Sequence, residues 1–123
     1  MSKEAIPVLD ELQVADLMAL DQGRGAIYGQ FVKAFVAVAQ SRFDLLARHA
    51  ESGDGAALAA GAHSLAGSAG NIGASRLAAL LGEIEAVGKG GDLAGAGELV
   101  SRLAAEYALA RDAMLIAANP TLG

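Results

Sequence analysis

The interior of this 123-residue chain contains no proline, because the two copies lie near the ends, at Pro7 and Pro120. Proline is the residue that most strongly breaks a helix, and the stretch between the two is rich in Ala and Leu, which favour helix. Four glycine-containing breaks divide this stretch, at residues 23–25, 52–54, 70–73 and 88–92. The pattern predicts an all-α chain of five helices.

The breaks also predict how the helices are connected. Asp54 and Asp92 each follow a glycine, the order expected where one helix ends at a left-handed glycine and an aspartate caps the next. Short connections between long amphipathic helices make them antiparallel neighbours. We therefore expect an up-down antiparallel four-helix bundle with an additional short N-terminal helix, built from residues 9–21, 25–51, 54–70, 74–88 and 92–118.

Apolar side chains at steps of three and four predict the buried face of each helix. In the first two helices these are Leu9, Leu12, Leu17, Leu20, Phe31, Phe35, Val38, Leu45 and Leu46. In the last two they are Leu77, Leu80, Leu81, Ile84, Val87, Leu93, Ala96, Val100, Leu103, Tyr107, Ala110 and Met114.

The length of the chain suits one domain, since single domains commonly have about 100 to 150 residues. We expect a single domain over residues 1–123, with its core over about 8–116, large enough to fold without disulfides or a structural metal. The chain has no Cys, which excludes disulfides and thiolate metal sites.

Charge and hydropathy exclude two classes of partner. Nine Lys and Arg against 14 Asp and Glu give a net charge of −5, so there is no basic footprint for nucleic acid or anionic lipid. The positive mean hydropathy of +0.40 comes largely from 29 Ala. The longest uncharged stretch, residues 55–75, contains polar side chains and five Gly, a poor composition for a membrane span. Residues 1–7 lack a signal peptide's apolar run, and we expect a cytoplasmic protein.

His63 lies on an unusual face of the third predicted helix. On a helical wheel Leu58, Leu65 and Ile72 lie about 180° to 220° from His63, so the imidazole points away from the core. An exposed helix face normally carries Glu, Lys, Gln or Arg. Around His63 the side chains are no larger than a methyl group: Ala56, Ala59, Ala60, Ala66, Gly67 and Gly70.

Two explanations of this small-residue face remain open. An Ala-rich sequence can carry a surface histidine that has no function. Alternatively, another macromolecule approaches closely enough to reach the ring, with Gly67 and Gly70 giving clearance. Glycine inside a helix costs roughly 0.8–1 kcal/mol relative to Ala, a loss that close docking of a partner or packing against a second chain explains.

The residues around His63 resemble the signature of the histidine-containing phosphotransfer (HPt) domain family. That signature reads approximately Ala-His-x-Leu-Lys-Gly-Ser, then Gly-Ala, then Leu a turn later and finally a Leu-Glu-like pair. The matching residues here are Ala62, His63, Leu65, Gly67, Ser68, Gly73, Ala74, Leu77 and the pair Ile84-Glu85. The resemblance extends to the order of the predicted helices over residues 8–116.

The resemblance implies a phosphocarrier of a two-component phosphorelay, without kinase activity of its own. His63 would accept a phosphoryl group from the aspartyl phosphate of one response-regulator receiver domain and pass it to the Asp of another. A neutral imidazole is a competent nucleophile for this transfer. The implied partners are receiver domains, with a hybrid histidine kinase as a further candidate. No cofactor is implied for this chain, and the Mg²⁺ that transfer requires is expected on the receiver domain.

The implied docking face combines His63 with Ala59, Ala66, Gly67 and Gly70. Residues of the second helix are expected to complete it. Which of them do so depends on the rotation of that helix, and the candidates are Gln30, Lys33, Ala34 and Ala37.

Ala66 departs from the family pattern, which has Lys three residues after the histidine. That Lys supplies positive charge near the phosphoryl group, and two unit charges 4 Å apart interact by about 4 kcal/mol at an effective dielectric of 20. We expect its loss to attenuate transfer without abolishing it. Lys33, Arg76 and the partner are alternative sources of the missing charge.

Three other polar residues have predicted roles. Glu85 occupies a position where the family often has Gln or Glu, and it either orients the ring of His63 through the nitrogen that is not phosphorylated or is a solvated carboxylate. Ser68 is expected to bond to its own helix. His49 is expected to complement the dipole at the end of the second helix.

Three functions therefore remain open. The first is the phosphotransfer protein, for which we expect a monomer. The second is a module of the same fold that binds receiver domains without carrying phosphate, which Ala66 alone favours. The third is a structural bundle that self-associates through the small-residue face and buries His63 in a dimer.

Overall fold

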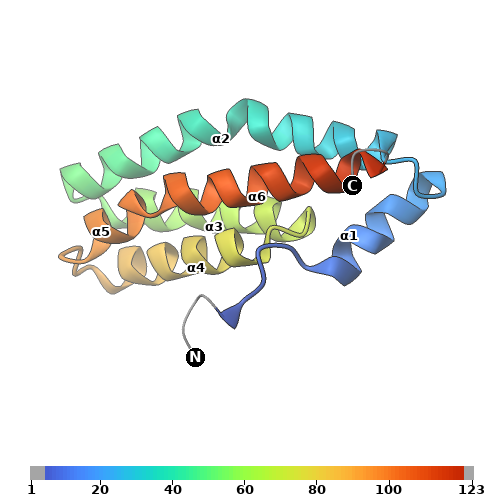
Figure 1. The fold of residues 1–123 in the computed structure, drawn as a ribbon. Helices are drawn as coiled ribbons and strands as arrows, with labels where there is room; N and C mark the ends of the chain where they lie inside the picture. The colour runs from blue at the N-terminus through green and yellow to red at the C-terminus, as the bar shows by residue number, and fades with distance from the viewer. Residues whose placement is uncertain (1–4, 121–123) are drawn as a thin grey trace.

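The structure, a computed structural model, describes residues 5–120 (Figure 1). Within this range the chain is helical and has no β-strand. Its long helices run alternately up and down, which confirms the predicted all-α up-down antiparallel four-helix bundle. The bundle consists of α2 (Ala26–Ser52), α3 (Gly55–Asn71), α4 (Ser75–Gly90) and the consecutive pair α5 (Ala96–Ser101) and α6 (Leu103–Ala118). Both ends of the predicted domain, residues 1–4 and 121–123, lie outside the described residues.

The additional N-terminal helix is also present. It consists of α1 (Glu11–Met18) and a 3₁₀ turn, η2 (Ala19–Asp21), and it lies across one end of the bundle (Figure 1). The side-chain amide of Gln13 donates a 2.6 Å hydrogen bond to the carbonyl of Asn71. This hydrogen bond ties α1 to the end of α3 and fixes one wall of an apolar groove between α1, α2 and α3.

The break between α2 and α3 has the predicted glycine-aspartate form. Gly53 ends α2 with a left-handed φ of 74°, and the Asp54 carboxylate accepts a 3.0 Å hydrogen bond from the backbone N–H of Ala57. This cap satisfies one of the backbone donors that a helix start leaves free. It fixes where α3 begins, and with it the face on which His63 lies.

The predicted fifth helix, 92–118, is wrong in two respects. The Asp92 carboxylate accepts a hydrogen bond from the N–H of Ala94, but it caps only a turn, and α5 begins at Ala96. Nearby glycines explain the late start, because Gly disfavours helix. The backbone N–H of Arg102 then donates to Leu99, three residues back, and this tighter turn separates α5 from α6.

The buried face of α2 also differs from the predicted one. Phe35 and Leu46 are buried as expected, but Phe31 and Val38 are both 42% exposed and Leu45 is exposed as well. Leu12 of α1 and Leu20 of η2 are likewise exposed, whereas Val14 of α1 is buried. The observed seam of α2 consists of Tyr28, Val32, Phe35, Ala39, Phe43 and Leu46.

Tyr28 shows why the observed seam of α2 is buried in place of the predicted one. Its hydroxyl donates a 2.8 Å hydrogen bond to the carbonyl of Ile72, which satisfies both groups within the core. Burial raises the pKa of Tyr28 to about 12. Both faces of α2 are apolar enough to be buried, so the periodicity alone does not choose between them.

Gly55 of α3 and Gly88 of α4 let these two helices approach through their backbones. A Cβ on Gly88 would lie 2.7 Å from the carbonyl oxygen of Gly55 and 2.8 Å from the backbone nitrogen of Ala59. Real Cβ atoms do not come so close to backbone atoms, so a side chain at residue 88 would push the helices apart. This close approach of the two backbones fixes α4 beside the part of α3 that carries His63.

Gly88→Ala is therefore expected to destabilise the protein by about 1–3 kcal/mol, the usual cost of overpacking. Gly82→Ala in the same helix is the matched control, because a Cβ there meets nothing within 4 Å. It should stabilise the protein by roughly 0.5–1 kcal/mol through helix propensity. Urea unfolding of both variants measures the two free energies, and an equal effect of the two substitutions would contradict the backbone contact.

Candidate functional site

His63 lies on the exposed side of α3, as predicted. Its side chain is 76% exposed, whereas Leu58 and Leu65 of the same helix are buried in the core. A Cβ on either Gly67 or Gly70 would meet no atom within 4 Å, so both positions are open to the outside. We call the exposed strip of His63, Gly67 and Gly70 the His63 face.

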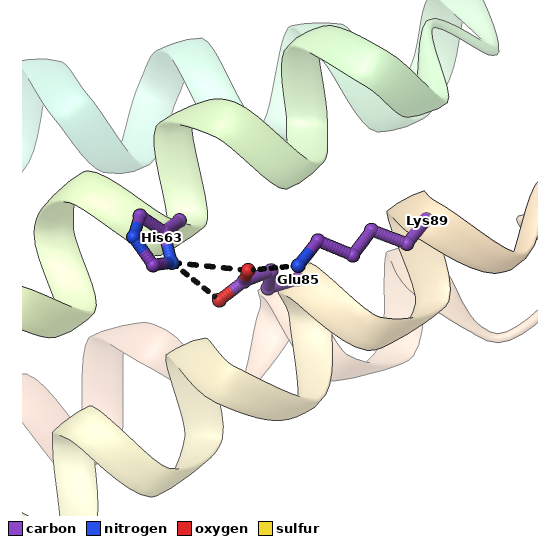
Figure 2. Close-up of polar contacts among 3 residues, drawn as sticks. All are labelled: His63, Glu85 and Lys89. Atoms are coloured by element: carbon purple, nitrogen blue, oxygen red, sulfur yellow. Dashed lines mark hydrogen bonds and ion pairs between the residues drawn. The ribbon is translucent and has the colours of Figure 1, made fainter.

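One nitrogen of the His63 ring is engaged by α4. Both carboxylate oxygens of Glu85 lie close to Nδ1, with Oε1 at 3.1 Å and Oε2 at 3.0 Å. Figure 2 shows Glu85 reaching from α4 toward the ring, with Lys89 on its other side. The Lys89 ammonium lies 2.7 Å from Oε2 of Glu85. The three side chains therefore form a chain of polar contacts across the α3–α4 seam.

The charge state of Glu85 determines which ring nitrogen carries hydrogen. The Lys89 ammonium, and then the contact with His63, hold the pKa of Glu85 below its ordinary value of 4.5, although desolvation opposes them. An ionised carboxylate can only accept hydrogen bonds, so Nδ1 of His63 must be the donor. In the neutral ring the lone pair is then on Nε2, the nitrogen that Glu85 does not contact.

The lowered pKa of Glu85 predicts a pH-dependent contribution to stability. Because the folded-state pKa lies below the ordinary 4.5, the contribution is present above that value and is lost as pH falls through the lowered pKa. Urea unfolding should show wild type more stable than Glu85→Gln at about pH 7, with the difference gone once Glu85 is protonated. A difference that persists in acid would show that ionisation of Glu85 is not its source.

Ala59, predicted to belong to the docking face, is buried, with 6% of its surface exposed, and its contact with a partner stays a prediction. Ala59 and Ala66 lie about 40° and 60° round the helix from His63, on the same flank. The backbone of α4 at Gly88 covers Ala59. Ala66 is half-buried, whereas Gly67 and Gly70 remain available for contact.

An apolar groove between α1, α2 and α3 opens on the other flank of α3. Phe31 and Val38, the exposed side chains of α2, line it. Its remaining lining residues are Gln13, Leu17, Ala34, Phe35, Arg42, Leu65, Ser68, Asn71 and Ile72. Ser68 lies five residues beyond His63, a rise of about 7.5 Å along the helix axis. We call this feature the α2–α3 groove.

The four α2 candidates for the docking face lie in different places, and which of them contact a partner stays a prediction. Ala34 lines the α2–α3 groove, whereas Gln30 and Lys33 line a separate hollow between α2 and α6. Ala37 is exposed and lines neither of these two hollows. Ser68, whose hydroxyl donates to the carbonyl of Ser64 at 3.3 Å, bonds to its own helix as predicted.

The sequence model described as "Hpt domain" matches residues 30–113, more than half of the chain. The chain belongs to the Hpt domain family. No curated protein matches the chain. The crystal structure of histidine-containing phosphotransfer protein B (HptB) from Pseudomonas aeruginosa PAO1 is similar to this Hpt domain, with a TM-score of 0.81 and 28% identity over 91% of this chain and 95% of that chain.

Lys89 is the residue of this Hpt domain that the sequence analysis missed. The signal was available, because Glu85 and Lys89 are four residues apart on one helix, the spacing at which an acid and a base meet. Lys33 and Arg76, the two residues suggested above as sources of the missing positive charge, make no described interaction with Glu85. Arg76 donates to the carbonyl of Ile6, and Lys33 lines the hollow between α2 and α6.

Among residues 5–120, none of the helices combines the length and the apolar character needed to cross a bilayer. Over the same residues, His, Asp and Glu side chains form no cluster of three that could hold a metal ion.

Proposed function

We propose that this Hpt domain is a phosphocarrier of a two-component phosphorelay, with His63 as the residue that is phosphorylated. The family supports a role in phosphotransfer, and its members interact with receiver domains and histidine kinases. The observation that carries the assignment of His63 is its combination of exposure and orientation. The ring is 76% exposed, and Glu85 engages Nδ1 and leaves Nε2 free.

The proposed transfer uses the lone pair of Nε2. This pair forms a bond to phosphorus as the bond between phosphorus and the oxygen of the receiver's aspartyl phosphate breaks, and the electron pair of that bond leaves on the aspartate. The ring keeps its hydrogen on Nδ1 and becomes positively charged. Donation to a second receiver domain is the reverse of these steps.

Glu85 has a positioning role in this proposal. Its carboxylate accepts the hydrogen bond from Nδ1, fixes the ring tautomer that has the lone pair on Nε2, and faces the positive charge that the ring acquires. The protein supplies no cofactor to the reaction. The Mg²⁺ required for transfer is held by the receiver domain.

The α2–α3 groove is the proposed docking site for the receiver domain. It offers exposed Phe31 and Val38 beside the His63 face, where Gly67 and Gly70 give clearance. Large exposed apolar side chains that line one groove are typical of a protein interface. A receiver domain that places an apolar surface in this groove could bring its aspartate to Nε2.

The experiment is phosphotransfer from a panel of phosphorylated receiver domains to the purified protein. A phosphohistidine is labile in acid and stable in base, so the linkage can be identified from its hydrolysis. Label with that behaviour on this chain would support the carrier. Receiver binding without label across the panel would contradict it and would favour the docking module that Ala66 suggests.

A further inference from the structure

The site lacks the cation that the family signature places three residues after the histidine. Ala66 occupies that position and is half-buried beside α4. A phosphoryl group on His63 would therefore lie close to the Glu85 carboxylate with no cation from α3 one turn away. The structure offers a different cation, from the neighbouring helix.

Lys89 is placed to act on His63 through Glu85. Its ammonium lies 2.7 Å from Oε2 of Glu85, and the same oxygen lies 3.0 Å from Nδ1 of His63. One carboxylate oxygen thus accepts from both nitrogens. The Glu85 side chain is only 16% exposed, whereas that of Lys89 is 68% exposed. The carboxylate is enclosed between two donors, with limited access to water.

The backbone of α4 favours a cation at residue 89 and holds it close to α3. Lys89 is in the last turn of α4, where the unpaired carbonyls of a helix end favour a cation. The close backbone approach of Gly55 and Gly88 fixes that turn against α3. Lys89 is therefore held near the seam by its helix, although its side chain is exposed.

We infer that Lys89 is a positioning residue for His63, whose ammonium holds the Glu85 carboxylate against Nδ1 and so keeps the lone pair on Nε2. The inference rests on the proposed phosphotransfer function for its consequence. Without Lys89, Glu85 gains other rotamers and water competes for its oxygens. The ring then spends more time as the tautomer that has hydrogen on Nε2, which cannot attack phosphorus.

The test is nitrogen NMR of the ¹⁵N-labelled imidazole rings at about pH 8.5, where a histidine ring of ordinary pKa is neutral. In wild type the His63 ring should carry hydrogen on Nδ1. Lys89→Met is expected to lower the ratio of the Nδ1–H to the Nε2–H tautomer by about 1.4- to fivefold, the range for one exposed ion pair. Lys89→Arg should retain the wild-type ratio. Lys33→Met is the matched control, and the ring of His49 is an internal one.

Phosphotransfer rates of the same variants complete the test. Lys89→Met should slow transfer in proportion to the fraction of rings that lose the Nδ1–H tautomer, a smaller factor than the change in the ratio, and Lys89→Arg should restore the rate. An unchanged ratio in Lys89→Met would overturn the inference, whether or not transfer slows, and so would a ratio that Arg fails to restore. The NMR result requires no phosphorylated partner. A tautomer that depends on Lys89 in a protein that never takes up phosphate would therefore contradict the proposed function and leave the positioning role intact.

Discussion

Replacing His63 by Gln is expected to abolish phosphotransfer, with a loss of at least about 10³-fold in rate, since the substitution removes the nucleophile itself. Gln is close to His in size and polarity, and the side chain at residue 63 is 76% exposed, so the fold should not change. Its amide nitrogen has no lone pair available for bonding to phosphorus. The measurement is transfer of labelled phosphate from a receiver domain to wild type and to His63→Gln.

His49→Gln is the matched control, because the chain contains only two histidines. His49 lies in the last turn of α2, and its loss should cost up to about 1 kcal/mol of stability through the helix dipole and leave transfer unchanged. The affinity of His63→Gln for the receiver domain should also remain within about twofold of wild type, because the docking groove is intact. Acid-labile label on His63→Gln would show that another residue accepts the phosphoryl group.

The fold could be predicted where residue chemistry decides it alone. The Gly53-Asp54 break is such a case, because a left-handed residue and an N-cap each favour particular side chains. The buried face of α2 could not be predicted in this way, because two neighbouring strips of side chains on α2 are both apolar. Choosing between them depends on what α2 packs against, including the hydrogen bond from Tyr28 to a carbonyl of another segment. Periodicity within one helix holds no information about that partner.

The residues of the candidate site also fall into two groups, those that the sequence of one helix predicts and those that depend on packing between helices. The exposure of His63 follows from its place opposite the core residues of its own helix, and the sequence predicted it. The burial of Ala59 depends on how closely α4 approaches, which is set by a contact between Gly55 and Gly88 in different helices. Glu85 was named from the family resemblance, and its contact with Nδ1 is a property of the α3–α4 packing. The prediction of a single domain over residues 1–123 stays a prediction.

Phe31→Glu is expected to weaken receiver binding by about 30- to 100-fold, which corresponds to a loss of roughly 2–3 kcal/mol. Phe31 is 42% exposed and lines the α2–α3 groove, so the substitution exchanges an exposed apolar contact for a carboxylate that a partner must desolvate. The partner's reacting residue in the proposed transfer is an aspartate, so a negative charge beside the His63 face adds repulsion. The affinity of wild type and variant for an unphosphorylated receiver domain can be measured by titration calorimetry.

Leu109→Glu provides the matched control, because Leu109 is 49% exposed but belongs to α6 and does not line the groove. The two substitutions add the same charge and remove a similar amount of exposed apolar surface. If the groove docks the receiver domain, only Phe31→Glu weakens binding and slows transfer, while both variants keep the wild-type unfolding midpoint within a small margin. Equal losses from the two would mean that net charge, not the groove, governs association. An unaffected Phe31→Glu would place the docking surface elsewhere. A second hollow, on the other flank of α3, is lined by His63, Glu85 and Lys89 and would then be the surface to test.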